Sequence, residues 1–340
     1  MQYTTLGHSG AVVSRFALGT MTFGSATGPE EASEQLDVYA AQGGTFVETA
    51  DVYNDGAAER IVGSWLTRLG PAERSRVFLA SKGRFPVGVD ARDAGLSRRH
   101  LRRALDASLS RLGVDHIDLY QLHAWDPLTP LEESLDFLAD AVQSGKISYG
   151  GLSNFTGWQI SKAVDYARGR FPLISMQPQY NLLVREVEWE IIPACIDGGL
   201  GVLPWSPLGG GWLTGKYSRD ERPTGSTRLG ENPNATGMEA YDRRNTLDRT
   251  WNVVDTLSTI AESRGLSLAQ IALAWLTAQP GVTSVILGAR TVSQLSDNLS
   301  AADVSLDASE LDLLQMASDP RPADYPYGES GIEQRSRSVS

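Results

Sequence analysis

The sequence has a single cysteine, Cys195, and only four histidines in 340 residues. One cysteine cannot form an internal disulfide and cannot supply a thiolate zinc cage. The histidines outside the strand ends, His8, His100 and His116, form no pair with metal-ligand spacing. We therefore expect Cys195 to be a small buried apolar residue, and we expect no metal.

Basic residues are the minority, and long hydrophobic runs are missing. The 30 basic and 41 acidic residues give a net charge of −11 and a pI near 4.9, which would repel nucleic acid and anionic membrane surfaces. No stretch approaches the ~18 apolar residues of a membrane span, and the first residues lack the pattern of a signal peptide. These absences predict a cytoplasmic protein without nucleic-acid or membrane partners, and they leave the oligomeric state open.

Short apolar segments alternate with longer segments of helical periodicity along the chain. The expected strands are residues 17–20, 45–50, 77–82, 117–123, 147–154, 173–180, 201–207 and 284–288. The expected helices are residues 30–41, 57–69, 97–112, 130–144, 158–167, 186–197, 266–278 and 292–301. Eight βα units over about 250 residues are typical of a closed parallel barrel, whereas an open doubly wound sheet usually has fewer strands. The sequence thus predicts an α/β fold of the (β/α)8 TIM-barrel class.

Several segments lie outside this alternation. We expect an N-terminal β-hairpin at 2–16 that turns at 8–10, and extra helices at 248–264 and 307–317. The polar segment 209–247 is too long for an ordinary βα turn and is expected to be a lid or disordered. We predict one domain, 1–318, and a C-terminal tail, 319–340, whose Tyr325 and Tyr327 either fold over the barrel mouth or are loose.

The strand ends carry a coherent set of polar residues. The second strand ends in the run Glu48-Thr49-Ala50-Asp51-Val52-Tyr53, the third strand ends at Lys82 and the fourth at His123. The C-terminal strand ends of such a barrel surround its site of chemistry. A tyrosine hydroxyl with a pKa near ~10 is a poor acid at neutrality unless a cation stabilises its phenolate. Lys82 is a candidate for that cation, a neighbouring carboxylate would hold it charged, and neutral His123 could donate a hydrogen bond to a substrate oxygen. Any one of these residues alone would more often be structural.

The motifs around these residues resemble the successive signatures of aldo-keto reductases, closest in pattern to the bacterial and potassium-channel β-subunit-like branch. They are FVETADVY at 46–53, ASK at 80–82, DLYQLH at 118–123, GLSN at 151–154, MQPQYN at 176–181, WSPLG at 205–209, GKY at 215–217 and GAR at 288–290, followed by Gln294 and Asn298. Their order and spacing also agree, and the resemblance covers roughly residues 2–318.

This resemblance implies a catalytic set of Tyr53, Lys82, Glu48 and His123, with Tyr53 as the general acid. The family normally has aspartate at the position of Glu48, so this chain departs from the pattern by one methylene. Asp51 is nearer to Tyr53 in the sequence, but that spacing need not direct it into the site. We assign the carboxylate role to Glu48.

The resemblance also implies a nicotinamide cofactor. Ser153, Asn154 and Gln177 would bind the carboxamide, and Trp205 would stack on the ring. The pyrophosphate would lie against Ser206, Leu208, Gly209 and Lys216, joined by Arg228. Gly288, Arg290, Gln294 and Asn298 at the start of the last helix favour a 2′-phosphate, so we expect NADPH/NADP⁺. The remaining implied contacts are Gly19, Thr20, Met21 and Pro207.

The resulting hypothesis is an NADPH-dependent reductase of an aldehyde or ketone, for example a sugar or a xenobiotic carbonyl. Phe23 and Trp125 flank the expected mouth and either line a substrate pocket or pack at its rim. One alternative is a nicotinamide-binding regulatory or redox-sensing subunit resembling potassium-channel β subunits, although a complete Tyr-Lys-His set favours turnover. Another is a metal- or phosphate-dependent barrel enzyme, for which the sequence offers no clustered ligands. No G-x-G-x-x-G motif follows the first strand, so a Rossmann fold has no support.

Overall fold

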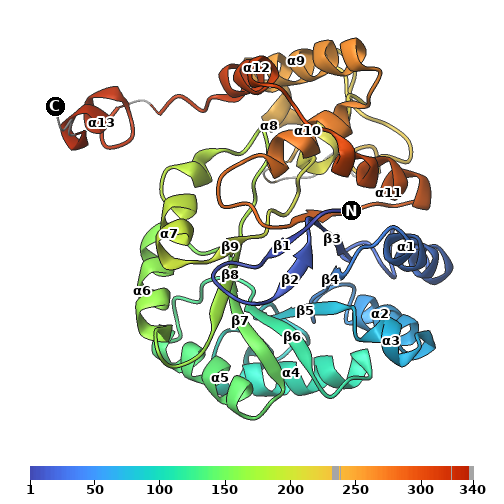
Figure 1. Ribbon diagram of the computed structural model, residues 1–340, viewed down its shortest axis with the longest axis vertical. Helices are drawn as coiled ribbons and strands as arrows, with labels where there is room; N and C mark the ends of the chain where they lie inside the picture. Colours follow the sequence, from blue (N-terminus) through green and yellow to red (C-terminus); the bar gives the residue numbers. More distant parts are fainter. Residues whose placement is uncertain (232–236, 238, 323, 337–340) are drawn as a thin grey trace.

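The chain folds as a (β/α)8 barrel (Figure 1). The structure is a computed structural model that describes residues 1–231, 237, 239–322 and 324–336. Eight parallel strands run in the order β10-β3-β4-β5-β6-β7-β8-β9. Their bounds are β3 Phe16–Gly19, β4 Phe46–Glu48, β5 Phe78–Gly83, β6 Ile117–Leu122, β7 Ile147–Ser153, β8 Leu173–Gln177, β9 Gly201–Val202 and β10 Val285–Leu287. The predicted fold class is confirmed.

The barrel closes between β9 and β10 through single hydrogen bonds. Thr283 N–H donates to the Val202 carbonyl at 2.9 Å, and Ile286 N–H donates to the Pro204 carbonyl at 3.0 Å. We predicted a strand at 201–207, but regular pairing ends at Val202. Pro204 and Pro207 have no N–H to donate to a ladder, and this shortens the regular strand.

Helices surround the sheet on its outer side (Figure 1). The helices of the repeating units are α1 Pro29–Ala41, α2 Ala57–Arg68, α4 Arg98–Leu112, α5 Leu131–Gln143, α6 Gly157–Ala167, α7 Ile191–Gly198, α10 Leu268–Thr277 and α11 Val292–Leu299. Helix α4 illustrates why they form. The Ser97 side chain accepts a hydrogen bond from His100 N–H at the start, Gly113 ends the helix with φ of 64°, and Leu101, Leu105 and Leu109 share its buried face.

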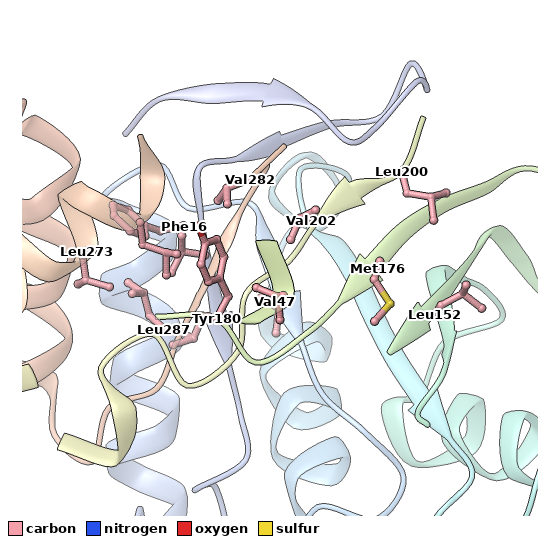
Figure 2. Packing of buried hydrophobic residues seen from close by; sticks show 14 of the residues in the cluster. Phe16, Val47, Leu152, Met176, Tyr180, Leu200, Val202, Leu273, Val282 and Leu287 are labelled. Carbon is pink, nitrogen blue, oxygen red and sulfur yellow. The ribbon is translucent and has the colours of Figure 1, made fainter. Parts of the chain in front are cut away.

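Buried apolar side chains form two layers. The larger lies between the strands and the helices, and Figure 2 shows Phe16, Val47 and Leu287 from strands with Leu273 from α10 in this layer. The smaller lies inside the barrel, where Leu6 and Val13 of the N-terminal hairpin contact strand residues including Phe46 and Leu119. The predicted hairpin is present as β1 Tyr3–Thr5 and β2 Val12–Ser14, and it covers the N-terminal end of the barrel. The hairpin therefore does not cover the carboxyl end of the barrel strands, where the predicted site residues lie.

The remaining elements lie outside the eight units. The predicted extra helices are present as α9 Asp248–Arg264 and α12 Ala308–Ser318, whereas α3 Pro71–Arg74, α8 Tyr241–Asn245 and α13 Glu329–Arg335 were not predicted. Of the segment 209–247, the described residues include 3₁₀ turns within Gly209–Thr214, interrupted by a kink at Gly210 and Gly211, and α8. Residues 232–236 and 238 lie outside the described residues. No helix among the described residues is long and apolar enough to cross a membrane.

Part of the tail packs against the barrel. The Tyr327 ring stacks on Trp189 with centroids 5.3 Å apart, and its hydroxyl donates to the Glu190 carboxylate. Tyr325 is 72% exposed. Of the two tail tyrosines, only Tyr327 therefore has a packing role in the structure.

Candidate active site

A buried lysine organises the carboxyl end of the barrel. Lys82 lies on β5 with no exposed surface, and its ammonium group donates to the Glu48 carboxylate. The same nitrogen lies 2.9 Å from the Thr49 carbonyl oxygen and 3.0 Å from the Tyr53 hydroxyl oxygen. Burial disfavours the charged amine, but the interactions with Glu48 and Tyr53 outweigh it and raise the pKa of Lys82 above its ordinary value. Lys82 is therefore a fixed cation beside the phenol.

Tyr53 stands in the turn after β4, with its ring half-buried and its hydroxyl directed at Lys82. Burial and the nearby Glu48 carboxylate raise the pKa of Tyr53 to about 12, and they outweigh the lowering effect of Lys82. We expected Lys82 to make the phenol more acidic. Lys82 does lower the pKa of Tyr53, but burial and Glu48 have the larger effect, so Tyr53 stays protonated at neutral pH.

His123 follows β6 beside this pair. Its ring lies edge-on to Tyr53 at 5.9 Å and to Phe85 at 4.6 Å, and its Nδ1 atom is buried without a hydrogen-bond partner. Burial, together with Lys82 and Arg84, holds the pKa of His123 well below its ordinary value. The imidazole is therefore neutral and can donate one hydrogen bond to a bound oxygen.

The structure distinguishes the two candidate carboxylates. Glu48 accepts from Lys82, lies 3.4 Å from the Gln177 amide nitrogen and is 3.5 Å from the Tyr53 hydroxyl. Asp51 is also fully buried, but neither of its oxygens has a hydrogen-bond partner. Burial and the nearby Glu59 raise the pKa of Asp51 to about 7. Glu48, not Asp51, is thus the partner of Lys82.

A small residue makes room for the Glu48 side chain. A methyl group placed on Gly19, at the end of β3, would lie 3.3 Å from the Glu48 Oε2 atom and 2.6 Å from Ile286. Thr20, the next residue, is buried with an unpartnered hydroxyl. Met21 is 47% exposed, and its carbonyl accepts from Asn54 at 2.9 Å. These residues form one wall of the site.

The residues predicted for a nicotinamide form a connected group. Ser153 Oγ donates to the Gln177 carbonyl at 2.9 Å, and the Asn154 amide nitrogen donates to the His123 carbonyl at 2.9 Å. The Trp205 indole N–H donates to the Asn154 side-chain oxygen at 3.1 Å. Asn154 adopts a positive φ of 55°, which aims its amide at both neighbours. Asn154 therefore fixes the half-buried Trp205 ring at the carboxyl end of the barrel.

The loop predicted for the pyrophosphate begins directly after Trp205. Pro207 is buried and Leu208 half-buried, while Gly209 and Gly210 have φ of 58° and 66°, a conformation that glycine adopts without strain. Glu239 lies against this backbone, since a methyl group on Gly210 would be 3.2 Å from its Cβ. The Glu239 carboxylate accepts from Gln179 at 2.5 Å and from Ser206 at 3.4 Å, and burial raises its pKa.

The start of α11 brings together the residues predicted for a 2′-phosphate. Arg290 N–H donates to the Gln294 side chain at 3.0 Å, Gly288 borders open space, and Asn298 is buried on the helix. The Arg290 guanidinium forms an ion pair with Glu231 at 2.8 Å. Lys216 and Arg228 contribute positive charge near Arg290.

The two predicted pocket residues differ in exposure. Trp125 is half-buried and makes edge contacts with Phe155 at 5.4 Å and with Trp158 at 5.3 Å, and Trp158 is itself 59% exposed. Phe23 has no exposed surface and belongs to the main core. Trp125 can therefore contact a bound molecule, whereas a pocket role for Phe23 stays a prediction.

A sequence model of the aldo/keto reductase family matches residues 15–319. The chain belongs to the aldo/keto reductase family. Its relatives include the uncharacterized oxidoreductase YrpG of Bacillus subtilis, 38% identical over 97% of this chain and 98% of that protein. A probable voltage-gated potassium channel subunit beta of Arabidopsis thaliana is 37% identical over 89% of this chain and 92% of its own length. The versiconal hemiacetal acetate reductase of Aspergillus parasiticus is 34% identical over 93% and 96%.

Sequence reasoning missed several residues of this aldo/keto reductase. Glu231 and Glu239 come from the long polar segment, where no periodicity indicates which side chains face the site. Phe85 and Arg84 follow β5 directly, so their place after Lys82 at a strand end was an available signal. The described residues hold no group of three or more His, Cys, Asp and Glu side chains placed to bind a metal ion.

Proposed function

We propose that this aldo/keto reductase uses NADPH to reduce an aldehyde or ketone of a small molecule to the alcohol, with Tyr53 as the general acid. The observation that carries the proposal is the 3.0 Å contact between the Tyr53 hydroxyl and the buried Lys82 ammonium, beside a neutral histidine at the carboxyl end of the barrel. The oxidoreductase relatives support carbonyl reduction in general terms.

Each of the four residues has a separate role in the proposed proton transfer. Tyr53 stays protonated at neutral pH because its pKa is about 12, so a proton is available on the phenol. Lys82 stabilises the phenolate that forms when this proton leaves, since the ammonium lies within hydrogen-bond distance. His123 is neutral because burial, Lys82 and Arg84 lower its pKa, so it can orient the substrate oxygen by a hydrogen bond from its ring. Glu48 keeps Lys82 charged and in place.

The residues present fit a nicotinamide dinucleotide. The Trp205 ring is fixed by Asn154 and offers a flat face. Gly209 and Gly210 have no side chains of their own that would block a pyrophosphate, and the neighbouring side chain there is Glu239. Arg290 and Lys216 would hold phosphate groups. When bound, the cofactor supplies the hydride for the carbonyl carbon.

A test of this proposal removes only the phenolic oxygen. Tyr53→Phe is expected to lower kcat for NADPH oxidation with a panel of aldehydes and ketones by about 100-fold or more, the usual contribution of general acid catalysis. NADPH binding, followed by fluorescence, should change less than about twofold, because the hydroxyl contacts Lys82 rather than the predicted nucleotide residues.

Tyr166→Phe is the matched control, since that tyrosine donates to Asp136 in the outer helical layer and should keep the wild-type rate. Equal kcat in Tyr53→Phe and wild type would exclude the mechanism.

A second candidate function is a nicotinamide-binding regulatory or redox-sensing subunit. The potassium channel subunit beta relatives favour it. The same assay separates the two, because a regulatory subunit would bind NADPH and show no Tyr53-dependent turnover with any carbonyl compound.

A further inference from the structure

Arg290, at the site predicted for a 2′-phosphate, already forms an ion pair with the carboxylate of Glu231. Its two terminal nitrogens each lie 2.8 Å from one oxygen of the Glu231 carboxylate, and one of them also donates to the Ser226 carbonyl at 3.3 Å. The Arg290 side chain is 25% exposed and that of Glu231 is 50% exposed. Glu231 therefore occupies the two-pronged face with which a guanidinium binds a phosphate.

Two further cations, Lys216 and Arg228, belong to the same region of positive charge as Arg290. Burial, and after it the positive charges of Arg290 and Arg228, lower the pKa of Lys216. Two of the backbone N–H groups at the start of α11 already have acceptors, because Val292 N–H donates to Glu31 at 2.5 Å and Gln294 N–H to Thr291 at 3.2 Å. An incoming anion must therefore bind mainly through the cationic side chains. Glu231 competes for one of these side chains, Arg290.

We propose that Glu231 sets the cofactor preference, because its carboxylate competes with the 2′-phosphate of NADPH for Arg290 and reduces the selectivity that Arg290 alone would give. The inference rests on the proposed function, which supplies the dinucleotide. A carboxylate and a phosphate cannot share one guanidinium face without repulsion. NADH has a hydroxyl at this position, which needs no exchange of the ion pair and can donate to the carboxylate.

The experiment measures binding of the oxidised dinucleotides to the whole chain, without a carbonyl substrate or turnover. Glu231→Gln keeps the shape of the side chain and removes its charge. We expect the Kd for NADP⁺ to fall about tenfold, as for the loss of a competing charged contact, and the Kd for NAD⁺ to stay within about twofold. Calorimetry or quenching of tryptophan fluorescence gives both constants.

Glu310→Gln is the matched control. Glu310 also pairs with both prongs of an arginine, Arg264, at 2.6 and 2.7 Å, but it joins α12 to the end of α9. It should change neither Kd. In an Arg290→Gln background the Glu231→Gln effect should disappear, because the competed group is gone.

An unchanged or weaker Kd for NADP⁺ in Glu231→Gln overturns the inference, and weaker binding would mean that Glu231 supports the site. If both dinucleotides bind and turnover depends on Tyr53, that result leaves the proposed function intact. If wild type binds neither dinucleotide, the proposed function fails together with the inference. Circular dichroism of the variant confirms that the comparison is made on folded protein.

Discussion

At the scale of single residues, the chemistry of the site depends on how strongly Lys82 is held. The expected strand ends predict that Tyr53, Lys82, His123 and a carboxylate meet there, because parallel strands of a barrel bring those ends together. The choice of Glu48 as the carboxylate came from the resemblance to the family. The sequence does not predict the direction of the pKa shift of Tyr53. That direction depends on whether burial and Glu48 outweigh Lys82, which is a matter of three-dimensional distances.

Glu48 is the residue at which the chain departs from the usual pattern of its family, and Glu48→Asp tests how much the extra methylene matters. The shorter side chain keeps the charge but moves the carboxylate away from Lys82, so we expect kcat to change by no more than about tenfold, or ~1.4 kcal/mol. Steady-state kinetics with a saturating carbonyl compound measures this change. Gly19 has no side chain beside the Glu48 carboxylate, so the site accepts either glutamate or aspartate at position 48.

Glu48→Gln is the comparison that separates charge from length. It keeps the length, leaves the buried ammonium without a counter-charge and should reduce kcat much more than the aspartate variant. A hundredfold loss in Glu48→Asp, or equal losses in the two variants, would contradict this assignment.

At the scale of secondary-structure elements, periodicity predicts long helices better than strand ends. The helix expected at 248–264 is α9 with those bounds, because its apolar stripe and following Gly265 mark both its face and its end. The helix expected at 186–197 is instead a short 3₁₀ turn, Glu186–Glu188, and α7. Irregular segments such as the one that holds Glu231 and Glu239 have no period, so their contribution to the site could not be predicted.

The N-terminal hairpin gives an element-scale prediction about stability. Leu6 has no exposed surface and belongs to the core layer inside the barrel, so Leu6→Ala should lower the free energy of unfolding by about 2–5 kcal/mol through lost burial and a cavity. The hairpin covers the end of the barrel opposite Lys82, so the Kd for NADPH should not change. Chemical denaturation and nucleotide titration measure the two quantities.

Val12→Ala on the same hairpin is the control, since Val12 is 60% exposed and its truncation should cost less than about 0.5 kcal/mol. Equal free energies of unfolding for the two variants would contradict the prediction that the hairpin stabilises the barrel from its N-terminal end. A large change in the Kd for NADPH in Leu6→Ala would also contradict it.

At the scale of the whole molecule, the last long helix belongs to the barrel domain. Leu314 of α12 is fully buried, and α12 lies along α9 (Figure 1). The buried Arg185 guanidinium donates to the Gln315 carbonyl at 3.0 Å and to the Ser318 hydroxyl at 2.9 Å. These contacts attach the end of α12 to the loop after β8. Among the described residues beyond α12, Tyr327 contacts the barrel at Trp189 and Glu190.

Two truncations test the predicted boundary between the domain at 1–318 and the tail. Removal of residues 319–340 deletes the stack of Tyr327 on Trp189, worth about 0.5–1.5 kcal/mol, and should lower Tm by no more than about 5 °C in a domain of this size. Removal from residue 307 onward also deletes α12. It exposes the groove that Leu314 fills and leaves the Arg185 guanidinium short of two acceptors, which should lower Tm by more than about 10 °C. Thermal unfolding followed by circular dichroism measures both. Equal losses of Tm would place the tail inside the cooperative unit and move the boundary to the end of α13, because the contacts of Tyr327 would then be as important as those of α12.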